Sequence, residues 1–240
     1  MAEERVIEIC CAGADDVAAA VEGGAARIEL CSVLSAEGVT PSPGLIDVAR
    51  SIAGNVAITV LVRPREGNFC YTAREVDVMV EDVRTIVAAG AQGVTIGALD
   101  ETGMPDRKTI ERLIKAADGK AELTFHRAID MCPDPVAAID ILSDLGFDRV
   151  LTSGGAPTAM EGVPTIRRMM ERAADRLVIM PGGGVRPDNI AKIHSLTGAT
   201  QFHSSARHKA DTSGHDNKIF GATHATVDSD IVRQLIKNSI

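Results

Sequence analysis

A chain of 240 residues with 45% hydrophobic residues and no low-complexity tract can bury a sizeable core, which excludes intrinsic disorder. Its net charge of −8, with both signs interspersed, and its aromatic content of only 2% exclude the usual nucleic-acid binder, which carries a basic surface and aromatic side chains for base stacking. The longest apolar stretch, 56–62, is far shorter than the roughly 20 residues of a membrane-spanning helix, so we expect no membrane partner.

Short β-branched runs alternate with Ala-rich amphipathic stretches along the whole chain. The runs predict strands near 5–10, 26–31, 56–62, 93–97, 122–126, 149–152, 177–180 and 201–203. The other stretches predict helices near 15–23, 44–53, 74–89, 106–117, 133–145, 158–174, 187–196 and 228–237. Eight strand–helix units in this length predict an α/β fold, a (β/α)8 TIM barrel, as a single domain over 1–240. A doubly wound open sheet is the alternative, and eight units would be many for it.

A repeated junction supports the barrel. Gly24, Gly90, Gly146 and Gly198 each follow a predicted helix and stand three or four residues before the second, fourth, sixth and eighth strands, at separations of 66, 56 and 52 residues. Glycine favours the left-handed conformation that commonly ends a helix. This spacing indicates a unit of two strand–helix pairs repeated four times.

Alternation along the strands sorts side chains into two faces. In the first two strands the isoleucines take one parity, which predicts contact with the helices, and Glu8, Cys10, Glu29 and Cys31 take the other, which faces the interior. Buried carboxylates cost several kcal/mol unless they are paired, and we expect Arg63 and Arg127 as their partners. Two interpretations stay open, an ion network inside the barrel and direct contact with a ligand.

Barrel active sites lie at the carboxyl ends of the strands. Cys10 and Cys31 end adjacent strands, roughly 5 Å apart in the pairing direction, and two thiolates suit Cu(I). The alternative is that both cysteines are small buried hydrophobic residues. The strand ends supply, in all, Cys10, Cys31, Arg63, Arg65, His126, Arg127, Asp130, Ser153 and His203.

Glycine-rich loops follow the sixth and seventh strands. Gly182, Gly183 and Gly184 would let the backbone approach an anion, and Ser205 and Arg186 add donors. Ser153, in the loop after the sixth strand, is a further candidate ligand-binding residue. The alternative is the geometry of a tight turn, because glycine adopts positive φ without strain.

His126, Arg127 and Asp130 form the best acid–base group, since a histidine near a carboxylate carries a proton near neutral pH. The alternative is a core histidine bonded to a backbone carbonyl. The long polar loop at about 204–227, after strand eight, has two interpretations, a lid over the mouth and a disordered segment.

Five cysteines without CxxC spacing, in a chain with an acidic start, predict reduced thiols and a cytoplasmic protein.

Several strings resemble the CutC family in register from about residue 5 to residue 207. Among them are Gly24-Ala-Ala-Arg-Ile-Glu-Leu-Cys-Ser, Val62-Arg-Pro-Arg-Glu-Gly-Asn-Phe-Cys-Tyr, Thr124-Phe-His-Arg-Ala-Ile-Asp, Ile179-Met-Pro-Gly-Gly-Gly-Val-Arg and Phe202-His-Ser-Ser-Ala-Arg. The resemblance implies a cytosolic TIM barrel, usually oligomeric, named for copper homeostasis, with Cys10 and Cys31 as candidate Cu(I) ligands.

Three functions follow as hypotheses. The first is a copper-handling protein that binds Cu(I) at Cys10 and Cys31 without catalysis and without an organic cofactor, as a homo-oligomer. The second is an enzyme acting on a small phosphorylated or carboxylated metabolite. In that enzyme the glycine loop and Ser205 hold the anion, Arg63 and Arg127 neutralise it, and His126 with Asp130 or a barrel glutamate moves a proton. The third is a non-catalytic scaffold barrel, which the polar interior argues against.

Overall fold

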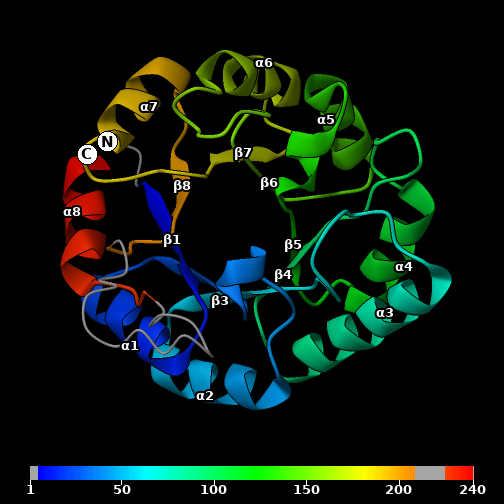
Figure 1. Cartoon of the computed structure of the whole chain (residues 1–240), viewed down its shortest axis with the longest axis horizontal. Helices are drawn as coiled ribbons and strands as arrows, with labels where there is room; N and C mark the ends of the chain where they lie inside the picture. The colour runs from blue at the N-terminus through cyan, green and yellow to red at the C-terminus, as the bar shows by residue number, and fades with distance from the viewer. Residues whose placement is uncertain (1–4, 209–224, 240) are drawn as a thin grey trace, which may run out of the picture.

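The computed structural model describes residues 5–208 and 225–239, and in it a ring of parallel strands is surrounded by helices (Figure 1). The strands are β1 (Val6–Cys11), β2 (Arg27–Leu30), β3 (Ala57–Leu61), β4 (Gly93–Ile96), β5 (Glu122–Phe125), β6 (Arg149–Thr152), β7 (Val178–Pro181) and β8 (Gln201–Ser204). The helices are α1 (Ala14–Gly23), α2 (Pro43–Ala53), α3 (Ala73–Ala88), α4 (Arg107–Ala117), α5 (Pro135–Asp144), α6 (Val163–Ala173), α7 (Ile190–Thr197) and α8 (Ser229–Ser239).

Neighbouring strands in the sequence are neighbours in the sheet. The hydrogen-bonded order is β7-β6-β5-β4-β3-β2-β1-β8, every pair is parallel, and β7 also contacts β8, so the sheet is a nearly closed barrel. The TIM-barrel prediction is confirmed, and the open sheet is excluded. None of the described helices combines the length and the apolar composition needed to cross a bilayer.

The predicted strands end within one residue of the observed ones, whereas two helices begin three or more residues later than predicted. Helix α7 begins at Ile190 because the Asn189 side chain closes a turn, accepting from the Arg186 N–H at 2.8 Å and donating to the Gly184 carbonyl at 2.8 Å. Helix α6 begins at Val163 because the preceding segment is held to the β7–α7 loop by a hydrogen bond from the Ala159 N–H to the Gly183 carbonyl at 2.8 Å. Two short 3-10 helices, η1 (Leu34–Ala36) and η2 (Arg127–Met131), were not predicted.

The four repeated glycines all adopt the left-handed conformation that their spacing predicts. Their φ angles are 89° at Gly24 and 79° at Gly90, Gly146 and Gly198. A side chain with a Cβ is strained there, which explains the recurrence of glycine at these helix ends.

The predicted parity of the first two strands is also confirmed. Ile7, Ile9 and Ile28 are buried in the large core cluster shared with the helices, whereas Cys10 and Cys31 form a separate small cluster with Leu61.

The segment 209–224 lies outside the described residues, so the predicted loop at about 204–227 can be followed only at its ends. Those ends meet in an antiparallel bridge between Arg207 and Val227. The Arg207 guanidinium pairs with the buried Asp16 and donates to the Cys10 carbonyl at 2.9 Å. The chain on both sides of this segment is therefore fastened to the end of β1.

Candidate functional site

The two thiols that the sequence placed at adjacent strand ends converge. Cys10 lies in β1 opposite Glu29 of β2, and Cys31 follows β2 directly. Their Sγ atoms are 3.7 Å apart, and the residues are only 6% and 1% exposed. The site is thus a buried sulfur pair at the carboxyl ends of the first two strands.

His203 of β8 joins this pair from the other side of β1. Its Nε2 lies 2.9 Å from Glu29 Oε2 and 4.0 Å from Glu8 Oε1. Ligand atoms of Cys10, Glu29 and His203 all lie within 4.8 Å of one another. Sequence reasoning placed His203 at a strand end but gave it no role, although it has the inward parity of Glu8, its partner in the β1–β8 register.

Burial and charge act against each other on these groups. Burial by itself would lower the pKa of His203, but the Glu29 charge and hydrogen bonds to Cys10 and Glu29 raise that pKa well above its usual range. Burial would likewise raise the pKa of Glu29, and His203 lowers it. The hydrogen bond with Cys31, together with burial, raises the pKa of the Cys10 thiol well above its usual range. The metal-free site therefore holds a protonated thiol beside an imidazolium–carboxylate pair.

The sulfur separation tells which metal geometry fits. With metal–thiolate bonds of about 2.3 Å, sulfurs 3.7 Å apart subtend an angle of about 107° at a bound ion. A linear two-coordinate ion would need the sulfurs about 4.6 Å apart by the same bond length. The resting geometry thus fits a bent site with room for a third ligand, and the His203 ring, which lies near Cys10 and Glu29, would fill it only after losing its proton.

The carboxylates inside the barrel have other partners than predicted. Glu8 Oε2 accepts from Arg27 Nε at 2.5 Å, and Arg27 also donates to Gln201 Oε1 at 2.9 Å. Glu29 pairs with His203. The prediction of Arg63 and Arg127 as partners was wrong because Arg27, the first residue of β2, stands directly opposite Glu8 in the strand register.

Arg63 and Arg65 hold loops. Arg63 Nη1 donates to the carbonyls of Ala36 at 2.8 Å and Gly38 at 2.9 Å, and its Nη2 donates to that of Gly67 at 2.9 Å. Arg65 pairs with Glu75 at 2.6 Å and also bonds to carbonyl oxygens of its own loop. Both guanidinium groups thus bond to the chain itself, although Arg63 Nε is buried without a partner among the described residues. No hydrogen bond or ion pair among the described residues joins either group to the thiol pair.

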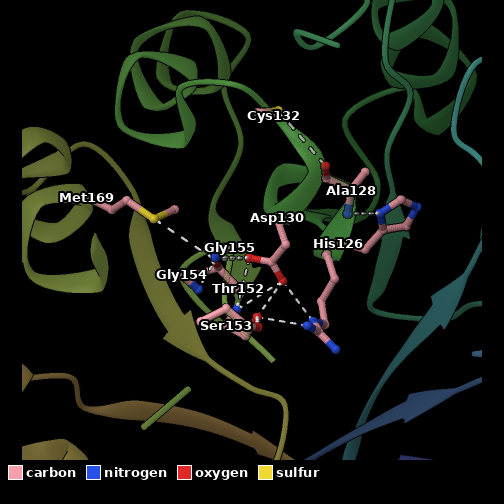
Figure 2. A network of polar contacts seen from close by, with 11 residues as sticks. His126, Ala128, Asp130, Cys132, Thr152, Ser153, Gly154, Gly155 and Met169 are labelled. Carbon is pink, nitrogen blue, oxygen red and sulfur yellow. Dashed lines mark hydrogen bonds and ion pairs between the residues drawn. The ribbon is translucent and has the colours of Figure 1, made fainter. Parts of the chain in front are cut away.

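Asp130, on η2, lies at the centre of a polar network at the ends of β5 and β6 (Figure 2). Its carboxylate accepts from the Thr152 hydroxyl at 2.5 Å and from the N–H groups of Ser153 at 3.1 Å and Gly155 at 3.0 Å. Arg127 Nε donates to it at 2.8 Å, and Arg127 Nη2 donates to Ser153 Oγ at 2.8 Å. With its oxygens so fully engaged, Asp130 is suited to position Arg127 rather than to accept a substrate proton.

The His126 ring does not share a proton with Asp130. Its Nδ1 accepts from the Ala128 N–H at 3.1 Å, as Figure 2 shows, and its Nε2 is buried without a hydrogen-bond partner among the described residues. Burial lowers the pKa of His126 to about 4, so the ring is neutral near pH 7 and carries its proton on Nε2. The structure therefore does not form the predicted acid–base couple.

The glycine loop after β7 lies against Arg127. Gly183 and Gly184 have φ angles of 88° and 73°, and a Cβ on Gly183 would lie 3.4 Å from the Arg127 Cζ atom. Gly182 instead donates its N–H to the Thr152 carbonyl at 2.8 Å. Ser205 is exposed, and its carbonyl accepts from Arg207 at 3.3 Å. The structure thus brings Gly183 to Arg127 and Ser153, and shows no such contact for Ser205.

Comparison with known proteins settles the family. The model of the CutC family matches residues 5–208. The chain belongs to the CutC family. The human (Homo sapiens) protein named copper homeostasis protein cutC homolog is 44% identical over 207 residues, which span 86% of this chain and 75% of that protein. A CutC family protein of Parabacteroides distasonis is 44% identical over 204 residues, 85% of this chain and 84% of its own length. The crystal structure of CutC from Streptococcus agalactiae has a TM-score of 0.80 at 33% identity, covering 84% of this chain and 98% of that one.

Proposed function

We propose that this chain binds Cu(I) through the thiolates of Cys10 and Cys31 and serves copper homeostasis. The observation that carries the proposal is the pair of buried Sγ atoms 3.7 Å apart, with the His203 imidazole close to Cys10. The name of the human relative, a copper homeostasis protein, supports the same metal. Binding would replace the thiol protons, so uptake of the ion releases protons.

The chemistry of the donors favours copper over its main rival. Soft thiolate ligands select Cu(I), which also accepts a low coordination number. Zn²⁺ is the competing cation, because two cysteines, a histidine and a carboxylate are also a zinc donor set.

A cytoplasmic location follows from the same site. Two free thiols this close together persist as thiols in a reducing compartment, and they become a disulfide in an oxidising one. The homo-oligomer that the resemblance implies stays a prediction.

An anaerobic titration of Cu(I) against a chromophoric chelator tests the proposal. We expect one ion per chain, a large loss of affinity in Cys10→Ser and in Cys31→Ser, and no loss in Cys132→Ser. Cys132 is the matched control because it is 7% exposed, close to the 6% of Cys10, and it lies at the end of η2. Equal affinity in the wild type and the Cys10→Ser/Cys31→Ser double variant would overturn the proposal, as would Zn²⁺ displacing Cu(I) at equal concentration.

The third ligand has its own test. His203→Gln should weaken Cu(I) binding without abolishing it. X-ray absorption of the copper-loaded wild type should show one nitrogen beside two sulfurs, and that nitrogen should be missing in the variant. Two sulfurs and no nitrogen in both proteins would show that the imidazole stays outside the copper shell.

A further inference from the structure

A second set of polar atoms lines the barrel where β4 and β5 lie side by side. Thr95 Oγ1, Thr124 Oγ1 and His126 Nε2 are buried and have no hydrogen-bond partner among the described residues. Thr95 and Thr124 are direct partners in the β4–β5 register, and His126 has the same inward parity two residues beyond Thr124. Unpartnered buried polar atoms are costly, so three on one inward face call for a ligand or ordered water.

The residues around the His126 ring leave space for it and hold it in place. A Cβ on Gly97, the inward position after β4, would lie 2.4 Å from the His126 Cε1 atom, so only glycine leaves space for the ring. The Phe69 ring packs on its other side at 4.9 Å between centroids. Because Nδ1 accepts from the Ala128 N–H, the neutral ring presents Nε2–H as a donor without an acceptor.

Arg127, the next residue, presents a fixed guanidinium to the mouth. Its Nε and Nη2 atoms are held by Asp130 and Ser153, while its Nη1 has no hydrogen-bond partner among the described residues. Its side chain is 43% exposed, and Gly183 leaves the approach to that free edge uncovered by any side chain of its own. The Asp130 carboxylate also accepts hydrogen bonds from the backbone N–H groups of Ser153 and Gly155, so it does not neutralise the Arg127 guanidinium fully.

We infer that this side of the mouth binds a small organic oxyanion, a carboxylate or a phosphate ester, with its charged group on the free edge of Arg127 and its polar body bonded to His126, Thr124 and Thr95. When one edge of an arginine is already held and the other is open, the side chain loses little conformational entropy on binding an anion. The site is separate in its residues from the thiol pair, so it stands or fails independently of copper.

Calorimetric titrations with inorganic phosphate, succinate and glycerol 3-phosphate, at constant ionic strength set with chloride, test the site. We expect the wild type to show saturable binding either of succinate or of both phosphates. Binding of succinate indicates a carboxylate site, and binding of both phosphates indicates a phosphate site. Arg127→Gln should lower the affinity for the probe that binds by about tenfold or more, which is the loss expected for one charge-assisted hydrogen bond. Arg127→Lys keeps the positive charge but loses the fixed guanidinium geometry. Its affinity for the probe should lie between those of the wild type and Arg127→Gln.

Arg112→Gln is the matched control, because Arg112 is 44% exposed, pairs with one exposed aspartate and lies on α4 outside the barrel. It should bind like wild type, and so should the Cys10→Ser/Cys31→Ser double variant. If the phosphates bind, glycerol 3-phosphate should bind more tightly than inorganic phosphate, and Thr124→Val should remove that gain. If succinate binds instead, Thr124→Val should weaken its binding. No saturable binding of any probe, or equal losses in Arg127→Gln and Arg112→Gln, would overturn the site. A gain that survives Thr124→Val would overturn the role of the interior face.

Discussion

The buried ion pair between Glu8 and Arg27 can be tested by a double-mutant cycle. Arg27 Nε lies 2.5 Å from Glu8 Oε2, and the side chains are 8% and 1% exposed. Arg27→Met leaves a buried carboxylate unpaired, which typically costs about 3–5 kcal/mol. His203 Nε2 lies 4.0 Å from Glu8 Oε1 and compensates part of that charge, so we expect about 3 kcal/mol.

The double variant Glu8→Gln/Arg27→Met removes both charges at once. It should cost only about 1–2 kcal/mol, because it leaves no unpaired ion behind. Glu8→Gln alone should cost about 1 kcal/mol, because Arg27 keeps its hydrogen bond to Gln201, so the coupling energy of the pair is about 2–3 kcal/mol. Urea unfolding followed by far-UV circular dichroism measures these values, since the chain has no Trp to report by fluorescence. The reference is a second cycle between Glu8 and Arg63, whose guanidinium bonds only to carbonyl oxygens and should show coupling below about 0.5 kcal/mol. A larger coupling to Arg63 than to Arg27 would refute the reasoning.

Three further outcomes follow from the interior and the thiols. Thr124→Val should leave the free energy of unfolding unchanged or raise it by up to about 1 kcal/mol, because the hydroxyl it removes is unpartnered, and a loss above that amount in urea unfolding would contradict the assignment. Gly97→Ala should cost about 1–3 kcal/mol, because the new Cβ meets the His126 ring 2.4 Å away; adding His126→Ala should recover much of it, and a neutral Gly97→Ala would show that the ring lies elsewhere. Cys70 is exposed and the other four cysteines are buried, so a thiol-reactive disulfide reagent should label one thiol rapidly in the native metal-free protein and five after denaturation; two or more rapid thiols would contradict the burial of the sulfur pair.

Local sequence signals were enough for the fold. Period-two alternation marked the strands, and glycines such as Gly24 and Gly90 marked helix ends because a left-handed residue is needed there. The position of Cys10 and Cys31 at adjacent strand ends was also predictable, whereas the approach of their sulfur atoms to 3.7 Å was not. Both have inward parity, and strands adjacent in the sequence of a barrel are adjacent in space.

The partners of the charged groups were not predictable in this way, because they depend on register and closure. Arg27 meets Glu8 through the β1–β2 register, and Arg63 is held by carbonyls of loops that have no regular pattern. His126 likewise lies at a strand end as predicted, yet its Nδ1 accepts a hydrogen bond from the Ala128 N–H and does not bond to Asp130. The residue types show which groups can ionise, whereas the tertiary structure determines which of these groups contact one another.

The sequence by itself determined the barrel, the inward parity and the adjacent strand ends of the two thiols, because each follows from a pattern within a strand or between consecutive strands. Only the tertiary structure decided the rest of the site. His203 is 193 residues from Cys10 in the chain and reaches Glu29 only because the barrel closes β8 onto β1, with Glu8 opposite His203. The stagger between the first and last strands is a property of the closed sheet as a whole, which no local segment encodes.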